Sequence, residues 1–313
     1  MPAKPQTLAD PPSLKLRRGS PSTLAEWHAW AQKRYAKHQV ALGQVADNAH
    51  DESLYLLLRT LDLPLESPAS VLRRKPTPEQ AAKLAEVFRR RTEEHVPAAY
   101  LTREAWLGGH KFYVDERVII PRSYFVELLP EAIPQWLPAN KPVKRVVDVC
   151  TGSGCLAVLL AERFPEAKVD AIELSPDAAT VARFNFAQNH LGARITLHRS
   201  DVFDAVKPLK YDVILSNPPY VPTREMRELP EEFRQEPAMA LDGGADGLDI
   251  VRKLLRQARE RLQPHGIVTL EVGQAKAALA ANFPELDPHW LPTGDGEDCV
   301  CVITAKRLQA WRG

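Results

Sequence analysis

The chain has 313 residues, of which 44% are hydrophobic and 26% charged, so it is long enough for about two domains with buried cores. Its formal net charge of +1 at pH 7 creates no strong field that would draw the whole protein to nucleic acid or to a membrane. No apolar run reaches membrane-spanning length and the N-terminus lacks a signal-peptide core, so we expect a soluble cytoplasmic protein with no membrane partner.

The cysteines and histidines give no metal-binding pattern. Cys150, Cys155, Cys299 and Cys301 form neither a CxxC pair nor a zinc spacing. We therefore expect reduced thiols in a reducing compartment. The nine histidines are scattered, and no HxxxH pair lies near a carboxylate. The sequence predicts no metal site.

The first third of the chain predicts a tail followed by a helical domain. Residues 1–21 are rich in proline and polar groups, which is typical of a disordered tail. Residues 22–105 carry apolar side chains at helical spacing, with Thr77 as a cap and Pro78 at the first helical position of one segment. The three expected helices are "STLAEWHAWAQKRYAKH", "DESLYLLLRTLDL" and "TPEQAAKLAEVFRRRTEEH".

Residues 106–120 predict a hairpin that connects two domains. The segment "FYVDERVII", residues 112–120, indicates a strand pair that turns at Asp115-Glu116. Glycines at 108 and 109 and a proline at 121 punctuate its two ends.

Residues 121–313 alternate between strand and helix patterns. Such alternation predicts an α/β domain in which a parallel sheet carries helices on both faces. Ligands bind such sheets at the carboxyl ends of the strands, near the point where the strand order reverses. Strands are expected at 143–149, 168–174, 194–200, 211–216, 266–272 and 299–306, and helices at 155–164, 176–190, 247–262 and 274–283.

A glycine-rich turn follows the first strand of this domain. In "DVCTGSGC", Asp148 to Cys155, the glycines allow a tight turn and let a ligand approach the amides at the start of the next helix. The spacing is not the GxGxxG dinucleotide fingerprint, and a bare strand-to-helix turn is an equally good interpretation. The candidate cofactor-binding residues of this turn are Asp148, Cys150, Thr151, Gly152, Ser153 and Gly154.

Two acidic residues close the next two strands. Glu173 in "DAIELSP" is placed to accept from both hydroxyls of a ribose, although it could also be a helix-entry charge beside Ser175-Pro176. Asp201 in "HRSDVFD" is placed to accept from the exocyclic amine of a purine, and a local turn cap is almost as good an interpretation. No Walker lysine accompanies them, so an adenosine ligand without phosphates, such as S-adenosylmethionine, fits best.

The stretch "NPPY", Asn217 to Tyr220, ends a strand with two residues that have no backbone N–H to donate. The carbonyl of Pro218 and the side-chain oxygen of Asn217 are two fixed acceptors that suit a substrate NH2 group. Pro219 keeps the turn rigid, and Tyr220 offers a flat face to a planar group. We therefore assign these four residues to catalysis on a conjugated NH2. A tight turn that merely ends a buried strand is the alternative.

Together, "DVCTGSG", "DAIELSP" and "SNPPY" resemble the N5-glutamine methyltransferases of the translation machinery. "VPAAYLTREAWLGGHKFYVDERVIIPRS" and "LPEEFRQEPAMALDGGADGLDI" are similar to the branch that methylates large ribosomal subunit protein three. The resemblance covers the chain from about residue 22. It implies a class I, Rossmann-like S-adenosylmethionine-dependent methyltransferase sheet and a small N-terminal helical domain that recognises substrate. It also implies cofactor contacts at Cys150 to Gly154, Glu173, Val202 and Asn217, with the glutamine amide held by Asn217 to Tyr220.

Three alternative functions stay open. In the release-factor branch, acidic residues and a threonine typically follow the "IPR" run, whereas Ser123-Tyr124-Phe125 follows Arg122 here. Nucleic-acid amino-methyltransferases share the NPPY motif but normally need a basic face. A non-catalytic S-adenosylmethionine-binding module for ribosome assembly is the third, and the intact motif argues against it.

Two further segments have both a functional and a structural interpretation. The basic runs at 73–75 and 89–91 could contact ribosomal RNA, although a solvated helix face is the more usual role. Residues 221–246 form a long segment beside the predicted site, either a lid that closes on substrate or a disordered loop.

Overall fold

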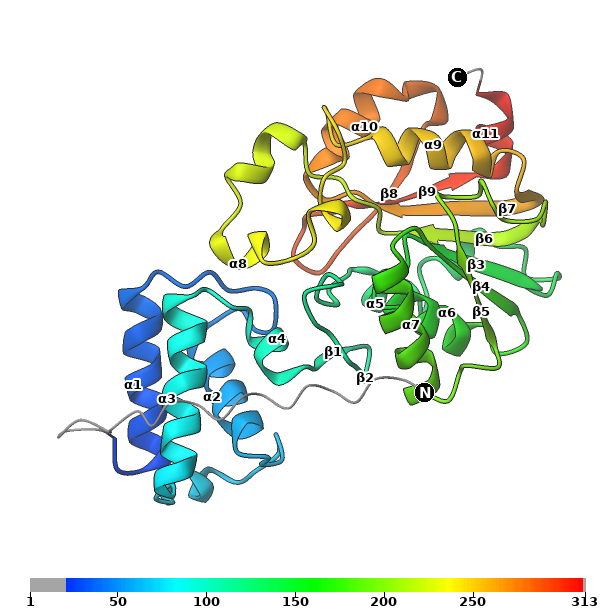
Figure 1. Cartoon of the computed structure of the whole chain (residues 1–313). Coiled ribbons are helices and arrows are strands. Elements are labelled where there is room, and N and C mark those ends of the chain that lie inside the picture. Colours follow the sequence, from blue (N-terminus) through cyan, green and yellow to red (C-terminus); the bar gives the residue numbers. More distant parts are fainter. Residues whose placement is uncertain (1–20, 312–313) are drawn as a thin grey trace. The chain divides into compact units, whose positions relative to one another are not determined.

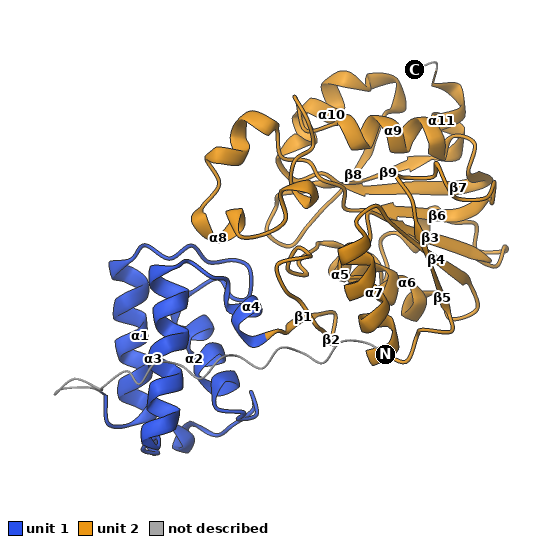
Figure 2. Cartoon of the chain, in the orientation of Figure 1, with its two compact units in different colours: residues 1–102 blue, residues 103–313 orange. Residues whose placement is uncertain are grey.

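The computed structural model describes residues 21–311 (Figure 1). The predicted tail lies outside the described residues except for its last position, Pro21. The chain forms two compact units that divide between Thr102 and Arg103 (Figure 2). The division falls before the hairpin, which belongs to the second unit rather than standing between the two.

The first unit is a set of helices around an aromatic and leucine core. Its helices are α1 (Leu24–Lys37), α2 (Ala49–Thr60), α3 (Pro78–Glu93) and α4 (Ala98–Thr102), with a 3-10 turn η1 (Ala69–Arg73). Thr23 caps α1, and Thr77 forms a reciprocal capping box with Gln80 at the start of α3. The fully buried side chains include Trp27, Tyr35 and Phe88, from α1 and α3.

An ion pair buried in this unit corrects the interpretation of the basic run at 89–91. Arg91 is fully buried, donates to Glu52 through Nε at 2.7 Å and lies over the ring of Tyr35. Arg89 pairs with Glu86 at 2.8 Å. Arg91 therefore stabilises the helix packing and has no access to RNA, whereas residues 73–75 are exposed.

The hairpin turns at a different place from the predicted one. Strands β1 (Ala105–Leu107) and β2 (His110–Phe112) pair antiparallel across Gly108 and Gly109, both of which have positive φ. Two consecutive left-handed residues make the tight turn that joins such strands, and glycine adopts that conformation without strain. The chain does turn at Asp115-Glu116, where the Val118 amide donates to the Asp115 carbonyl and the Asp115 carboxylate binds Arg117, but no strand follows, so the strand pair predicted around this turn is wrong.

The second unit contains a seven-stranded sheet in the order β5-β4-β3-β6-β7-β9-β8. Strands β3 to β7 are parallel. The strand predicted at 299–306 is present as β9, but it runs antiparallel to β7 instead of parallel, and β8, which pairs antiparallel with β9 at the edge, was not predicted. The strands are β3 (Arg145–Val149), β4 (Lys168–Glu173), β5 (Ile195–Arg199), β6 (Tyr211–Ser216), β7 (Leu262–Glu271), β8 (His289–Leu291) and β9 (Val300–Thr304).

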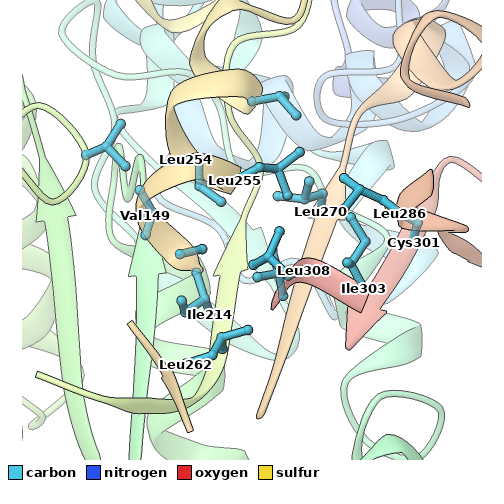
Figure 3. Close-up of a cluster of buried hydrophobic side chains, with 14 of the residues drawn as sticks. Val149, Ile214, Leu254, Leu255, Leu262, Leu270, Leu286, Cys301, Ile303 and Leu308 are labelled. Carbon is cyan, nitrogen blue, oxygen red and sulfur yellow. The ribbon is translucent and has the colours of Figure 1, made fainter. Parts of the chain in front are cut away.

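Helices cover both faces of this sheet (Figure 1). Helices α6 (Cys155–Arg163) and α7 (Pro176–Gln188) pack on β3, β4 and β5. On the other face, Leu254 and Leu255 of α9 (Asp249–Ala258) and Leu308 of α11 (Ala305–Ala310) belong to one buried hydrophobic cluster with Val149 and Ile214 of the sheet (Figure 3). The remaining helices are α5 (Phe125–Leu128), α8 (Glu231–Arg234) and α10 (Lys276–Asn282). This double covering confirms the α/β fold class.

The sheet order places a topological switch between β3 and β6. From β3 the chain proceeds outward to β4 and β5, and from β6 it proceeds the other way to β7. Loops that leave the carboxyl ends of two such strands diverge and leave a crevice between them. The segments that follow Val149 and Ser216 are the glycine-rich turn and the NPPY stretch. Across residues 21–311, no helix is both long and apolar enough to cross a membrane.

Candidate active site

A cavity lies at the carboxyl ends of β3, β4, β5 and β6. It collects residues from four separate segments that the sequence singled out. The predicted residues that line it are Cys150, Thr151, Gly152, Ser153, Glu173, Asp201, Val202, Asn217 and Pro219. Further lining comes from residues 117–119 and 121–122 and from Pro237, Met239 and Ala240 of the long segment. Asp148, Gly154, Pro218 and Tyr220 do not line it.

Asp148 stabilises the glycine-rich turn through a buried hydrogen bond to Thr151. Its side chain is fully buried and accepts a hydrogen bond from the Thr151 hydroxyl. Burial raises the pKa of Asp148 to about 7. Its predicted role as a direct cofactor contact does not fit this position, because the carboxyl faces the turn and not the cavity.

The two glycines of the turn serve different purposes. Gly154 has φ +85°, and a Cβ there would lie 2.5 Å from the ring of Phe186. Gly152 has φ +54°, lines the cavity and would meet nothing within 4 Å. Gly154 therefore lets α6 begin close against α7. Gly152, which has no side chain, leaves the space beside it in the cavity open.

Backbone strain gathers at the cavity wall. Cys150 has φ +65° and Val202 has φ +51°, although neither is a glycine. A β-branched residue in this region is a clear outlier, and such strain concentrates at functional sites. The predicted cofactor position Val202 is thus held in its place by the surrounding fold, with its side chain buried.

Glu173 ties β4 to the glycine-rich turn. Its Oε2 accepts from the Gly152 amide and its Oε1 from the Ser175 amide, each at 2.8 Å. Burial raises the pKa of this carboxyl, and the two backbone donors oppose that shift. Each oxygen has a further lone pair, so Glu173 can still accept from a ligand in the cavity.

Asp201 is engaged by a lysine. Its Oδ2 lies 2.7 Å from Nζ of Lys253, which also pairs with Asp204. Asp201 lines the cavity, yet one of its two carboxylate oxygens is paired with Lys253 of α9. Its predicted role as the acceptor for a purine amine therefore depends on its second oxygen.

Asn217 is oriented by a residue that sequence reasoning missed. Its Nδ2 donates to Oε1 of Glu271 over 2.9 Å. Glu271 ends β7, is 4% exposed, and accepts also from the Ser123 hydroxyl and the Tyr124 amide at Oε2. The sequence did contain a signal for Glu271. In "GIVTLEV" an acidic residue ends an apolar strand, which is the same pattern that singled out Glu173.

Tyr220 packs into the protein. Its ring lies against Gly273, where a Cβ would approach Cε2 to 2.5 Å. Burial raises the pKa of Tyr220 to about 12, so its hydroxyl stays neutral. Of the NPPY residues, Asn217 and Pro219 line the cavity, whereas Tyr220 and the buried Pro218 lie on the side of the turn away from it.

The long segment 221–246 is structured and does not form a disordered loop. It contains the 3-10 turns η3 (Thr223–Arg227) and η4 (Ala238–Ala240) besides α8, and Val221 bridges to Asp242. Glu236, also buried, accepts from Arg122 at 2.8 Å, and Arg122 lies over the ring of Phe233. Its role as a moving lid stays a prediction.

Comparison with known proteins identifies the family. The model of the methyltransferase small domain matches residues 127–245. Three ribosomal protein uL3 glutamine methyltransferases are similar over nearly their whole lengths. The one from Burkholderia pseudomallei is 46% identical and covers 90% of this chain and 94% of the relative. The one from Bordetella pertussis is 44% identical, with 91% and 96% covered, and that from Neisseria gonorrhoeae is 42% identical, with 92% and 96% covered.

The chain belongs to the ribosomal protein uL3 glutamine methyltransferase family. It is therefore a methyltransferase, as the sequence predicted, and S-adenosylmethionine is the methyl donor of this class. The charges around the cavity fit that donor. The only cations among the described lining residues, Arg117 and Arg122, are paired with Asp115 and Glu236. A triphosphate would lack a counter-charge there, whereas an adenosine with a cationic sulfonium and ammonium suits the acidic lining.

Proposed function

We propose that this enzyme methylates the side-chain nitrogen of a glutamine in ribosomal protein uL3, giving N5-methylglutamine. The orientation of the Asn217 amide carries the proposal. Because its NH2 group donates to Glu271 and Asn217 lines the cavity, we take its oxygen as the atom offered to a ligand there. An acceptor at that position selects a substrate group with hydrogens to donate, and a glutamine amide has two.

The cofactor is held by the residues that line the cavity next to Asn217. In this proposal Glu173 accepts from the ribose hydroxyls, Val202 packs on the adenine, and Asp201 accepts from the adenine amine. The turn from Cys150 to Ser153 borders the remaining part of the donor. When bound, S-adenosylmethionine supplies an electrophilic methyl group, whose bond to sulfur breaks as the bond to the amide nitrogen forms.

The NPPY residues position the acceptor amide. Asn217 Oδ1 accepts from an amide hydrogen and stabilises the positive charge that grows on nitrogen. Holding the amide through this hydrogen directs the weak lone pair at the methyl group, which supplies the orientation that a poor nucleophile needs. The second acceptor predicted from sequence, the Pro218 carbonyl, is not assigned this role because Pro218 does not line the cavity. The extra proton leaves to solvent after transfer, so no strong base is required.

The similarity to the three relatives favours this substrate assignment over its alternatives. All three relatives described above are uL3 enzymes, and none is a release-factor enzyme. We therefore propose uL3 as the protein partner and the cytoplasm, where ribosomal proteins are made, as the place of reaction. Contact of residues 73–75 with ribosomal RNA during assembly stays a secondary proposal, supported by the exposure of these three cations.

Methyl transfer from labelled S-adenosylmethionine tests the proposal. Free uL3, a release factor and an RNA oligomer are offered side by side to the full-length enzyme. Label on uL3 alone is expected. Label on the release factor would overturn the substrate, and label on RNA alone would overturn both the substrate and the amide grip. No transfer to any of them would favour a binding module.

A further inference from the structure

Asn217 can be placed in two ways that differ by a rotation of its amide. One presents the oxygen to the cavity and the other presents the NH2 group. Only the first suits a glutamine, because an NH2 group at that position would instead attract a carboxylate. The Asn217 side chain alone does not favour either orientation of its amide, so the orientation is set by its hydrogen-bond partner.

That partner is a carboxylate fixed at both oxygens. Glu271 Oε2 accepts from the Ser123 hydroxyl and, at 3.1 Å, from the Tyr124 amide, which leaves Oε1 for Asn217. Ser123 lies in the segment just after Arg122, so two elements far apart in the sequence meet on this one side chain. Glu271 does not line the cavity. It acts on the substrate only through Asn217.

We infer that Glu271, held by Ser123 and the Tyr124 amide, is a positioning residue that sets the rotation of the Asn217 amide and thereby the preference for glutamine over glutamate. This inference rests on the proposed function. An ionised carboxylate has no hydrogen to donate, so it binds only the NH2 group of Asn217 and excludes the wrong rotation. A glutamine at 271 has both a donor and an acceptor and removes that exclusion.

Glu271→Gln is therefore the decisive variant. It preserves the shape of the side chain but lets Asn217 rotate. We expect kcat for uL3 to fall on the order of 100-fold, the scale of a small misplacement at a reacting centre. We expect the Kd for S-adenosylmethionine to change less than about 2-fold, because Glu271 is outside the cavity lining.

A competitor separates positioning from simple structural damage. The uL3 variant whose acceptor glutamine is replaced by glutamate is added as an inhibitor. It should bind the wild-type enzyme poorly and Glu271→Gln about 10-fold more tightly, because a rotated Asn217 offers its NH2 group to the carboxylate. A loss of packing alone would not improve binding of an acid.

Two controls keep the test decisive. Asp212→Asn alters another buried carboxylate of the same sheet, one that binds the amides of Lys144 and Arg145 at the opposite end of β6, and should leave kcat unchanged. Where Glu271→Gln fails to fold, Ser123→Ala should lower kcat and Ser123→Thr should restore it.

Two results would overturn the inference: a Glu271→Gln enzyme with kcat within about 3-fold of wild type, or an unchanged preference against the glutamate competitor. Failure of the proposed function gives a different result, since the wild-type enzyme would then not methylate uL3 at all.

Discussion

Nδ2 of Asn217, just after β6, lies 2.9 Å from Oε1 of Glu271, the last residue of β7. The acceptor that faces the cavity is thus coupled to a buried carboxylate. That carboxylate titrates in the neutral range, because burial raises the pKa of Glu271 to about 7 against the opposing hydrogen bond from Ser123.

Catalysis should therefore depend on pH. Above a pH of about 7 Glu271 is ionised, can only accept, and holds Asn217 in the productive rotation; below it the added proton allows the other rotation. Arg122, paired with Glu236, is the cation that faces Glu271. Burial raises the pKa of Tyr220 to about 12 and that of Cys299 to about 11, so both stay neutral. We expect kcat at saturating substrates to rise with pH and then level off.

The Glu271→Gln enzyme provides the control for this profile. It has no carboxylate at 271 to titrate, so its residual kcat should lose the rise near neutral pH. A wild-type profile that is flat between about pH 6 and 8 would contradict the coupling. The same rise in both enzymes would assign it to another group.

Asn217→Ala should separate binding from chemistry. The change removes the acceptor for the substrate amide but leaves Glu173 and the glycine-rich turn in place. We expect much of the S-adenosylmethionine affinity to persist, measured by calorimetry, and methyl transfer to be lost. Turnover that survives within a few-fold of wild type would show that the amide is held elsewhere.

Glu173→Ala should weaken cofactor binding by about 1–3 kcal/mol, the scale of hydrogen bonds to a charged group. The change also removes the acceptors for Gly152 and Ser175. Asp201→Ala is the comparison, and its effect should be smaller because Asp201 is already paired with Lys253. An affinity that calorimetry finds unchanged in Glu173→Ala would exclude the ribose role.

Gly154→Ala should destabilise the second unit. The new methyl group would meet Phe186 at 2.5 Å, and φ +85° adds backbone strain of about 1–3 kcal/mol. Gly109→Ala is a matched control, because its φ of +81° is nearly the same while nothing lies within 4 Å of the new Cβ. Urea unfolding should show the larger loss for Gly154→Ala. Equal losses would mean that contact with Phe186 does not matter.

The parts of the site that could be predicted from sequence follow strong local patterns. Val146 to Val149, apolar except for Asp148, and Val213 to Leu215 are strand patterns that lead into unusual residues, so the turn and the NPPY stretch were placed correctly at strand ends. Parallel strands bring such ends to one edge whatever their distance in the chain. That is why Cys150, Glu173, Val202 and Asn217 share a cavity.

The parts that could not be predicted depend on packing between distant segments. Glu271 has no motif of its own, and its contacts with Ser123 and Asn217 bridge 148 and 54 positions of sequence. Arg91 looked like a surface charge because its partner Glu52 is on another helix. The three residues of β8 are too few to show a period.

The most direct test of the account is the position of the methyl group on uL3. Wild-type and Asn217→Ala enzymes are incubated with uL3 and S-adenosylmethionine, and the products are mapped by tandem mass spectrometry. The account predicts one added methyl on the side-chain nitrogen of a glutamine with the wild-type enzyme and none with Asn217→Ala. Methyl on any other residue type, or equal modification by both enzymes, would contradict it.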